Sequence, residues 1–158
     1  YLWFRFEWQF GLAGVIALLH DICAVVGIFA LLGWEFNLTI VAAVMTIAGY
    51  SINDSVVVFD RVRENLRKYK TMPVIELIDL SINQTLSRTF LTGITTIMVL
   101  IVLYFMGGEA LRGFSFAMLF GVIVGTYSSV FVAVPLLLYL NVRRGSVAAG
   151  ETAVAERP

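Results

Sequence analysis

Two charged residues lie inside stretches of the sequence that are otherwise apolar enough to cross a membrane. Asp54 lies in the run from Leu38 to Phe59, and Arg88 lies in the run from about Thr85 to Met106. A charge in mid-bilayer costs on the order of 3 kcal/mol on insertion scales, so such residues are typical of ion and proton pathways. Burial favours a protonated carboxyl, whereas a nearby guanidinium favours the carboxylate. Asp54 and Arg88 therefore indicate a proton-coupling pair, and a structural ion pair is the alternative.

Helical geometry predicts that these two side chains lie at a similar depth. Asp54 is six residues before Asp60, and Arg88 is seven residues after Ser81, which corresponds to about 9 and 10 Å along a helix. Each belongs to a polar stripe at i, i+3 and i+4 spacing. The stripes consist of Thr46, Tyr50, Asn53 and Asp54, and of Thr85, Arg88, Thr92, Thr95 and Thr96. We expect the hydroxyls and amides of Tyr50, Ser51, Asn53, Thr92 and Thr95 to support the pair.

Two further pairs of ionisable residues are candidate sites. His20 and Asp21 lie within the first apolar run, where they form either a proton relay or polar contacts that hold helices together. Asp60 and Arg61 lie at the end of the second run, as a solvated boundary with a snorkelling arginine or as a docking contact. No metal or cofactor site is expected, because the sequence has one histidine and one cysteine, Cys23.

The composition indicates that these residues lie on membrane-spanning helices. The chain of 158 residues is 59% hydrophobic and only 14% charged, whereas soluble domains are about a quarter charged. A helix of about 20 apolar residues spans a bilayer, and four stretches reach this length: residues 10–32, 38–60, 83–106 and 111–140. The sequence therefore predicts an all-α integral membrane protein with four transmembrane helices, and Pro135 predicts a kink near the end of the fourth.

The segments outside the spans carry further expectations. Residues 1–9 have the pattern of the end of a preceding transmembrane helix and an interfacial turn, which indicates a fragment whose upstream part is missing. Residues 61–80 are expected to form a cytoplasmic loop that begins as a charged helix. Ser81 and Gln84 have capping-box spacing and predict that a new helix starts at Ser81. The tail, residues 145–158, is expected to be disordered.

The distribution of positive charge predicts the orientation. One loop contains five Lys and Arg residues, namely Arg61, Arg63, Arg67, Lys68 and Lys70, and Arg5, Arg143 and Arg144 fall on the same side. Cytoplasmic loops carry the excess of Lys and Arg, so both ends are expected inside. The net charge is zero, which gives no basic field that would attract nucleic acid.

The second and third spans resemble a known family. The residues that carry the likeness are GYSINDSVVVFDRVREN (49–65) and SINQTLSRT (81–89), together with WFRFEW (3–8), His20-Asp21 and residues 121–129. They are similar to the SecF family, the smaller membrane subunits of bacterial SecD–SecF protein-export complexes. The resemblance implies an arrangement like that of RND transporters, in which Asp54 and Arg88 serve proton transport. It also implies a location in the bacterial inner membrane and no enzymatic activity.

The same resemblance implies the partners: SecD, the SecYEG translocon with YajC and YidC as further candidates, membrane lipid, and an exported preprotein contacted by a missing periplasmic domain. With SecD, such a subunit uses the proton-motive force to promote protein translocation. The alternatives are an RND-type exporter of small molecules or lipids and an assembly scaffold without conduction. An intramembrane serine protease is disfavoured, because no serine has a nucleophile-like setting with a base in reach.

Overall fold

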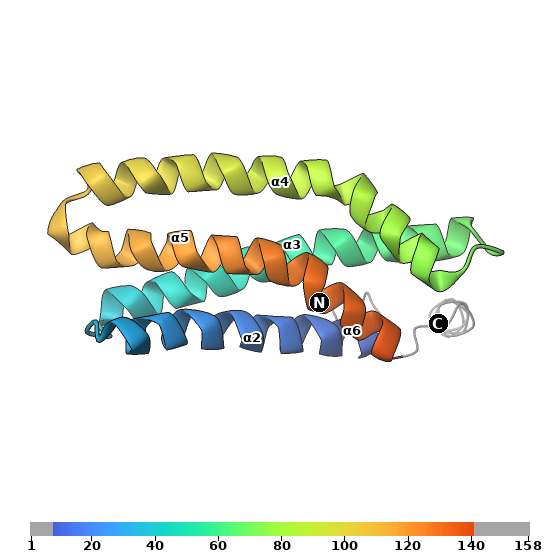
Figure 1. Cartoon of the computed structure of the whole chain (residues 1–158), viewed down its shortest axis with the longest axis horizontal. Coiled ribbons are helices and arrows are strands. Elements are labelled where there is room, and N and C mark those ends of the chain that lie inside the picture. The colour runs from blue at the N-terminus through green and yellow to red at the C-terminus, as the bar shows by residue number, and fades with distance from the viewer. Residues whose placement is uncertain (1–7, 141–158) are drawn as a thin grey trace, which may run out of the picture.

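The structure, a computed structural model, describes residues 8–140 as a bundle of helices (Figure 1). Predictions for the upstream end and for the tail, including those for Arg5, Arg143 and Arg144, lie outside the described residues. The helices are α2 (Trp8–Leu32), α3 (Leu38–Lys68), α4 (Val74–Met106), α5 (Gly108–Phe131) and α6 (Ala133–Tyr139), and residues 8–140 contain no strand.

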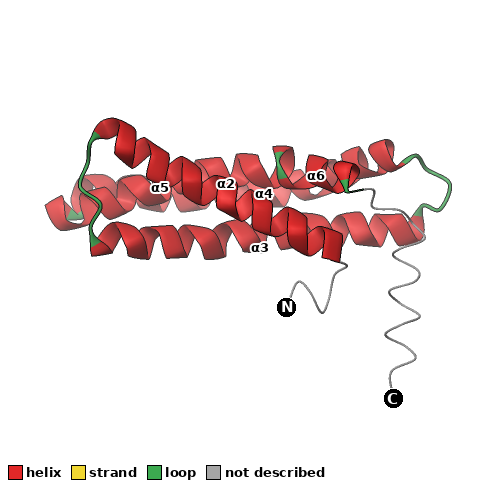
Figure 2. Cartoon of the chain, turned by 90° about the horizontal axis from the view of Figure 1, so that it is seen from below, coloured by secondary structure: helices red, strands yellow, loops and turns green. Residues whose placement is uncertain are grey.

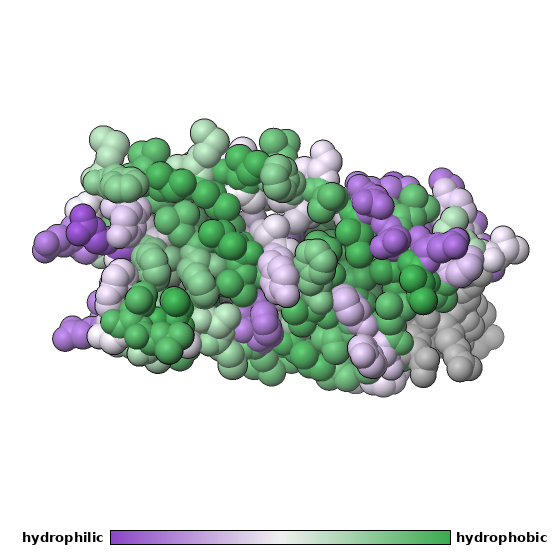
Figure 3. All heavy atoms as spheres, in the orientation of Figure 1, coloured by the Kyte–Doolittle hydropathy of each residue, from purple (hydrophilic) through white to green (hydrophobic). Residues whose placement is uncertain are grey.

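Four stretches of the bundle are long and apolar enough to cross a membrane: α2, α3, α4, and α5 taken together with α6. Even the shortest, with 25 residues, extends about 37 Å and exceeds the roughly 30 Å of a hydrocarbon core. On the face shown in Figure 3, apolar side chains cover most of the middle, and hydrophilic side chains gather mainly at the two ends. The prediction of an all-α membrane protein with four spanning helices is therefore confirmed.

The connections between the spans are short turns with identifiable local causes. Gly33 ends α2 with a positive φ of 64°, a conformation that costs glycine little. Asn37 then starts α3, since its side chain accepts a hydrogen bond from the backbone N–H of Ile40 at 3.1 Å. Gly108, with a φ of 75°, reverses the chain between α4 and α5. These turns make consecutive spans run antiparallel (Figures 1 and 2).

The predicted helix start at Ser81 is wrong. Helix α4 begins at Val74, directly after Pro73, and continues without interruption through Ser81. The Ser81 hydroxyl donates to the carbonyl of Leu77 at 2.8 Å instead of capping a helix. Leu77 and Ile78 are buried in the core, so packing favours one long helix over a break. Consequently most of residues 61–80 are helical, and only residues 69–73 connect α3 to α4.

The fourth span bends where the sequence contains Pro135. Helix α5 ends at Phe131 and α6 begins at Ala133. A proline ring clashes with the carbonyl four residues earlier and lacks an N–H donor, which accounts for a break one turn before Pro135. The bend turns α6 toward α2 and the end of α3 (Figure 1).

Helix α5 is the central element, because it contacts α2, α3, α4 and α6. The core consists of two apolar clusters, one at each end of the bundle. The first includes Phe10, Phe59, Leu77 and Leu137, and the second includes Phe29, Ile47, Leu100 and Val122. Between them on every span lie buried polar residues: Asp21 on α2, Ser51, Asp54 and Ser55 on α3, Thr85 and Thr89 on α4, and Ser128 and Ser129 on α5. We refer to these eight residues as the polar layer.

Candidate functional site

Asp54 lies in the polar layer between α3, α4 and α5, and its residue surface is only 8% exposed. One carboxylate oxygen, Oδ1, accepts a hydrogen bond from the Thr89 hydroxyl at 3.3 Å. The other, Oδ2, is buried and has no hydrogen-bond partner among the described residues. A buried polar atom without a partner is costly, and such atoms concentrate at functional sites. Asp54 therefore has one free acceptor position inside the membrane.

Serine hydroxyls extend the polar layer from Asp54 into the contact between α3 and α5. Ser55 and Ser129 lie 3.3 Å apart at their hydroxyl oxygens, and the Ser129 hydroxyl also donates to the carbonyl of Gly125 at 2.8 Å. The Ser129 hydroxyl of α5 and the Thr89 hydroxyl of α4 are the two that lie close to the Asp54 carboxyl. The carboxyl is thus in reach of hydroxyl groups on both neighbouring helices.

Tyr50 forms the next part of this environment, one turn from Asp54 along α3. Its hydroxyl is buried without a hydrogen-bond partner among residues 8–140, and so is the hydroxyl of Thr126 on α5. A Cβ atom on Gly93 of α4 would lie 3.5 Å from the Thr126 hydroxyl and 3.9 Å from that of Tyr50. Gly93 of α4 therefore packs against two unbonded hydroxyls, one from α3 and one from α5.

Arg88 does not pair with Asp54 in this structure. Its side chain is exposed on α4, and the described residues give it no ion pair and no side-chain hydrogen bond. Its charge is the feature of Arg88 that reaches Asp54 in this arrangement. The partner of Asp54 on α4 is instead Thr89, the residue that follows Arg88.

The predicted polar stripes are rotated relative to the faces that are buried. Thr46, Asn53, Thr92 and Thr95 are exposed, while Tyr50 is half-buried and Ser51 is buried. The Thr92 and Thr95 hydroxyls donate to carbonyls of their own helix, those of Arg88 and Leu91, at 2.8 and 3.0 Å. Asn53, Thr92 and Thr95 thus lie outside the buried surroundings of Asp54 in this chain, and their supporting role stays a prediction. The sequence did not identify Thr89, Ser55 and Ser129 as neighbours of Asp54. For Thr89 a signal was available, because Thr85, Thr89 and Gly93 repeat at i+4 and mark a second polar face of the helix.

His20 and Asp21 form a second polar group on α2. Asp21 is fully buried, and the His20 side chain is 43% exposed. The His20 Nδ1 atom lies 3.2 Å from Asp21 Oδ1, and the Ser51 hydroxyl of α3 donates to Asp21 Oδ2. The two predicted residues are thus brought together with Ser51, which was predicted as a support of Asp54.

Arg61 at the end of the membrane-spanning part of α3 contacts α4. Its Nε donates to the Gln84 side chain at 2.8 Å, and its Nη1 pairs with Glu64 at 2.7 Å. Buried Asn65 donates to Ser81 at 2.8 Å and to Gln84 at 3.0 Å. Asp60 is exposed. Arg61 and Asn65 therefore join two helices of the chain, a contact that neither prediction for Arg61 included.

Replacing Asn65 by alanine is expected to weaken the contact between α3 and α4. Each hydrogen bond contributes about 1 kcal/mol net, so loss of the two should lower the stability of the purified full-length protein by about 1–2 kcal/mol. Thermal unfolding in detergent measures this. Asn83→Ala, at an exposed position of α4, is the control, and an equal effect of both variants would contradict the assignment.

Among residues 8–140, no group of three His, Cys, Asp or Glu side chains is arranged to hold a metal ion. The chemistry that the described site provides is therefore that of carboxyl, hydroxyl and imidazole groups, which bind and transfer protons. The fold and the site define a polytopic helical membrane protein with buried carboxylates in a polar layer at mid-span.

Comparison with known proteins identifies the family. Residues 1–143 match the family model of the protein export membrane protein SecD/SecF, C-terminal. Protein translocase subunit SecF of Cereibacter sphaeroides is 57% identical over 145 residues, which cover 92% of this chain and 45% of that protein. SecF of Rhodobacter capsulatus is 57% identical over 144 residues, 91% of this chain and 43% of that protein. The chain therefore belongs to the SecD/SecF C-terminal family.

A solved structure extends the similarity to three dimensions. The crystal structure of SecDF in its super-membrane-facing form matches with a TM-score of 0.87 and 47% identity, and it covers 96% of this chain and 21% of that one. The chain thus spans less than half the length of the two SecF relatives and about a fifth of SecDF. The resemblance inferred from the Asp54 and Arg88 motifs is confirmed.

Proposed function

We propose that the chain is the C-terminal membrane part of an accessory subunit of the Sec preprotein translocase, which works with SecD in the bacterial inner membrane. Asp54 binds and releases the proton that couples the proton-motive force to protein movement. The observation that carries this proposal is the buried carboxyl of Asp54, with its unbonded oxygen, in a layer of hydroxyls. The decisive test is export by the full-length protein with Asp54→Asn.

The outward face of α4 favours a partner helix within the membrane. Arg88, Thr92 and Thr95 are exposed on this chain, and a guanidinium facing lipid at this depth is costly. A helix of SecD that supplies an acceptor would remove this cost, and the named relatives are subunits of a translocase. In this proposal Arg88 changes its distance from Asp54 as the two subunits move, and thereby favours proton release.

Arg88→Ala in the full-length protein is expected to reduce proton-dependent export severalfold, because the positive charge that favours the Asp54 carboxylate is lost. Arg88→Lys, which retains the charge, should keep part of the activity. Export of a pulse-labelled preprotein and co-purification with SecD are measured on the same cells. Thr92→Ala, on the same face of α4, is the control for losing a helix contact without losing a charge. Normal export by Arg88→Ala would refute the role of the Arg88 charge.

The remaining partners follow from the proposed place in the translocase. We propose that the whole protein acts beside the SecYEG channel, with YajC and YidC as neighbouring components, and that a periplasmic domain contacts the exported preprotein.

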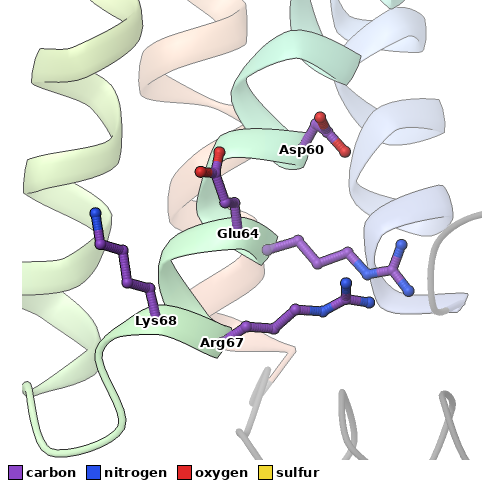
Figure 4. A pocket seen from close by; sticks show the side chains of 5 residues that line it. Asp60, Glu64, Arg67 and Lys68 are labelled. Carbon is purple, nitrogen blue, oxygen red and sulfur yellow. The ribbon is translucent and has the colours of Figure 1, made fainter.

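The orientation of the bundle is proposed from the positive charges near the end of α3. Asp60, Arg63, Glu64, Arg67 and Lys68 line a groove there, and Figure 4 shows the labelled side chains extending from successive turns of α3. The opposite end has a groove with Glu35 and Glu109. Since cytoplasmic segments carry the excess of Lys and Arg, we place the turn between α3 and α4 inside the cell.

Cysteine labelling of intact cells tests this orientation. In a Cys23→Ala background, a membrane-impermeant maleimide is expected to label Glu35→Cys in intact cells. It should label Lys68→Cys only after the cells are opened, because the proposed orientation places position 68 on the cytoplasmic side. Labelling of Lys68→Cys from outside, with none at Glu35→Cys, would reverse the assignment.

A further inference from the structure

Asp21 is an ionisable group at mid-span that the proposed role of Asp54 does not use. It is fully buried on α2, where α3 and α5 close around it. The Ser51 hydroxyl donates to Oδ2, and a Cβ atom on Gly125 of α5 would lie 3.8 Å from the same oxygen. Gly125 therefore packs directly against the carboxyl group of Asp21, at the point where the three helices meet.

The only ion-pair partner of Asp21 among the described residues is His20, the preceding residue. From α3 the group that contacts Asp21 is the hydroxyl of Ser51, and from α5 it is the backbone of Gly125, neither of which titrates. A fully buried carboxylate with a single hydroxyl donor is costly. The imidazole of His20 lies 3.2 Å from the carboxyl of Asp21, so the two groups are placed to share one proton.

The exchange between these two groups needs one short proton transfer. When His20 is an imidazolium, its Nδ1–H faces Asp21 Oδ1 at 3.2 Å; transfer of that proton breaks the N–H bond, forms an O–H bond and leaves neutral imidazole and carboxylic acid. The His20 side chain is 43% exposed and Asp21 is not exposed at all. One hydrogen bond therefore connects the outer face of α2 with the interior of the bundle.

Ser51 connects this group to the environment of Asp54. The two residues are three apart on α3, and both are buried. A Cβ atom on Gly125 would also touch Ser51 at 3.6 Å, and the carbonyl of Gly125 accepts from Ser129, which contacts Ser55. Asp21 and Asp54 are thus connected by residues of one contact between α3 and α5.

We propose that His20 and Asp21 form a second proton-binding site in the membrane domain, loaded from the outer face of α2 and coupled to Asp54 through Ser51 and α3. This proposal rests on the proposed proton-coupled function of Asp54, but the occupancy of the site can be measured independently of export. It differs from a purely structural contact, which needs a hydrogen-bond acceptor for Ser51 and no proton.

Infrared titration of the full-length protein, purified with SecD and reconstituted in lipid, measures the protons directly. Over a series of pH values, two carboxylic C=O bands are expected to change, one lost in Asp21→Asn and the other in Asp54→Asn. Because His20 controls the first group, His20→Gln should shift the midpoint of the Asp21 band. The exposed Asp79→Asn of α4 is the matched control. A spectrum in which Asp21→Asn removes no titrating band would overturn the proposal.

Export in cells with normal complex abundance provides the second measurement. Asparagine keeps an acceptor for Ser51, so a structural contact predicts normal proton-driven export by Asp21→Asn, whereas a proton-binding site predicts at least a severalfold loss. His20→Gln should shift the pH dependence of export. If Asp54→Asn exports normally while the Asp21 band titrates, the proposed function fails and the second proton-binding site stands. If the His20 and Asp21 variants both export normally with an unaltered pH profile, the coupling of this site to export is refuted.

Discussion

Full-length protein with Asp54→Asn is expected to assemble with SecD in normal amounts and to lose proton-dependent export. Asparagine has nearly the size of aspartate and can still accept from Thr89, but it cannot release a proton. One charge moving through 100 mV is worth about 2.3 kcal/mol, and loss of that drive corresponds to roughly a forty-fold change in an equilibrium. Pulse-chase export assays with and without an uncoupler measure the effect.

Two companion variants distinguish coupling from structure in this experiment. Asp79→Asn removes an exposed carboxylate of α4 and should export normally, whereas Asp54→Glu, which keeps a titrating group, should retain part of the activity. If Asp54 served only as a structural residue of an assembly scaffold, Asp54→Asn would lower the abundance of the complex with SecD. Normal uncoupler-sensitive export by Asp54→Asn would rule out the proton role.

Gly121→Ala is expected to destabilise the protein more than any other alanine substitution of a glycine within α2–α5. A Cβ atom at Gly121 would lie 2.3, 2.5 and 2.9 Å from three side-chain carbons of Ile47. Ile47 is fully buried, so neither it nor the backbone of α3 has room to move. Overpacking of this kind costs about 1–3 kcal/mol, occasionally more, which thermal unfolding of the purified full-length protein should detect.

The double variant tests the stated cause. Ile47→Ala removes all three carbon atoms that a Cβ at Gly121 would meet, so Gly121→Ala/Ile47→Ala should be more stable than the sum of the two single changes predicts. Gly27→Ala on α2 is the control, because nothing lies within 4 Å of its added carbon. Additive effects in the double variant, or equal losses at both glycines, would contradict the role of Gly121 in bringing α3 and α5 together.

The spans and the family were predictable because their signals are local. Long apolar runs interrupted by short turns dictate membrane-spanning helices in any arrangement, and the glycine and asparagine of the first turn occupy the positions that end one helix and begin the next. The ends of the helices beyond the membrane were less predictable. Ser81 has the side chain of a helix cap, but burial of Leu77 and Ile78 decided in favour of a continuous α4.

The buried face of each helix was the main feature that the sequence did not reveal. Arg88, Thr92 and Thr95 make one plausible polar stripe of α4, and Thr85, Thr89 and Gly93 make another about a hundred degrees away. In a soluble protein the polar stripe would face water and settle the choice. In a membrane both the lipid and the core are apolar, so a hydrophobic pattern does not say which way a helix is rotated.

The sequence by itself determined the class of protein, the positions of its spans and the presence of ionisable groups at mid-membrane, because these depend on composition and on spacing along one helix. Only the tertiary structure decided that Asp54 meets Thr89 and not Arg88, and that Asp21 meets Ser51. Those contacts depend on how closely α3 and α5 approach, which Gly121 permits, and on the rotation of α4 against both. Contacts between helices are set by packing among all the spans at once, and no single stretch of sequence contains that information.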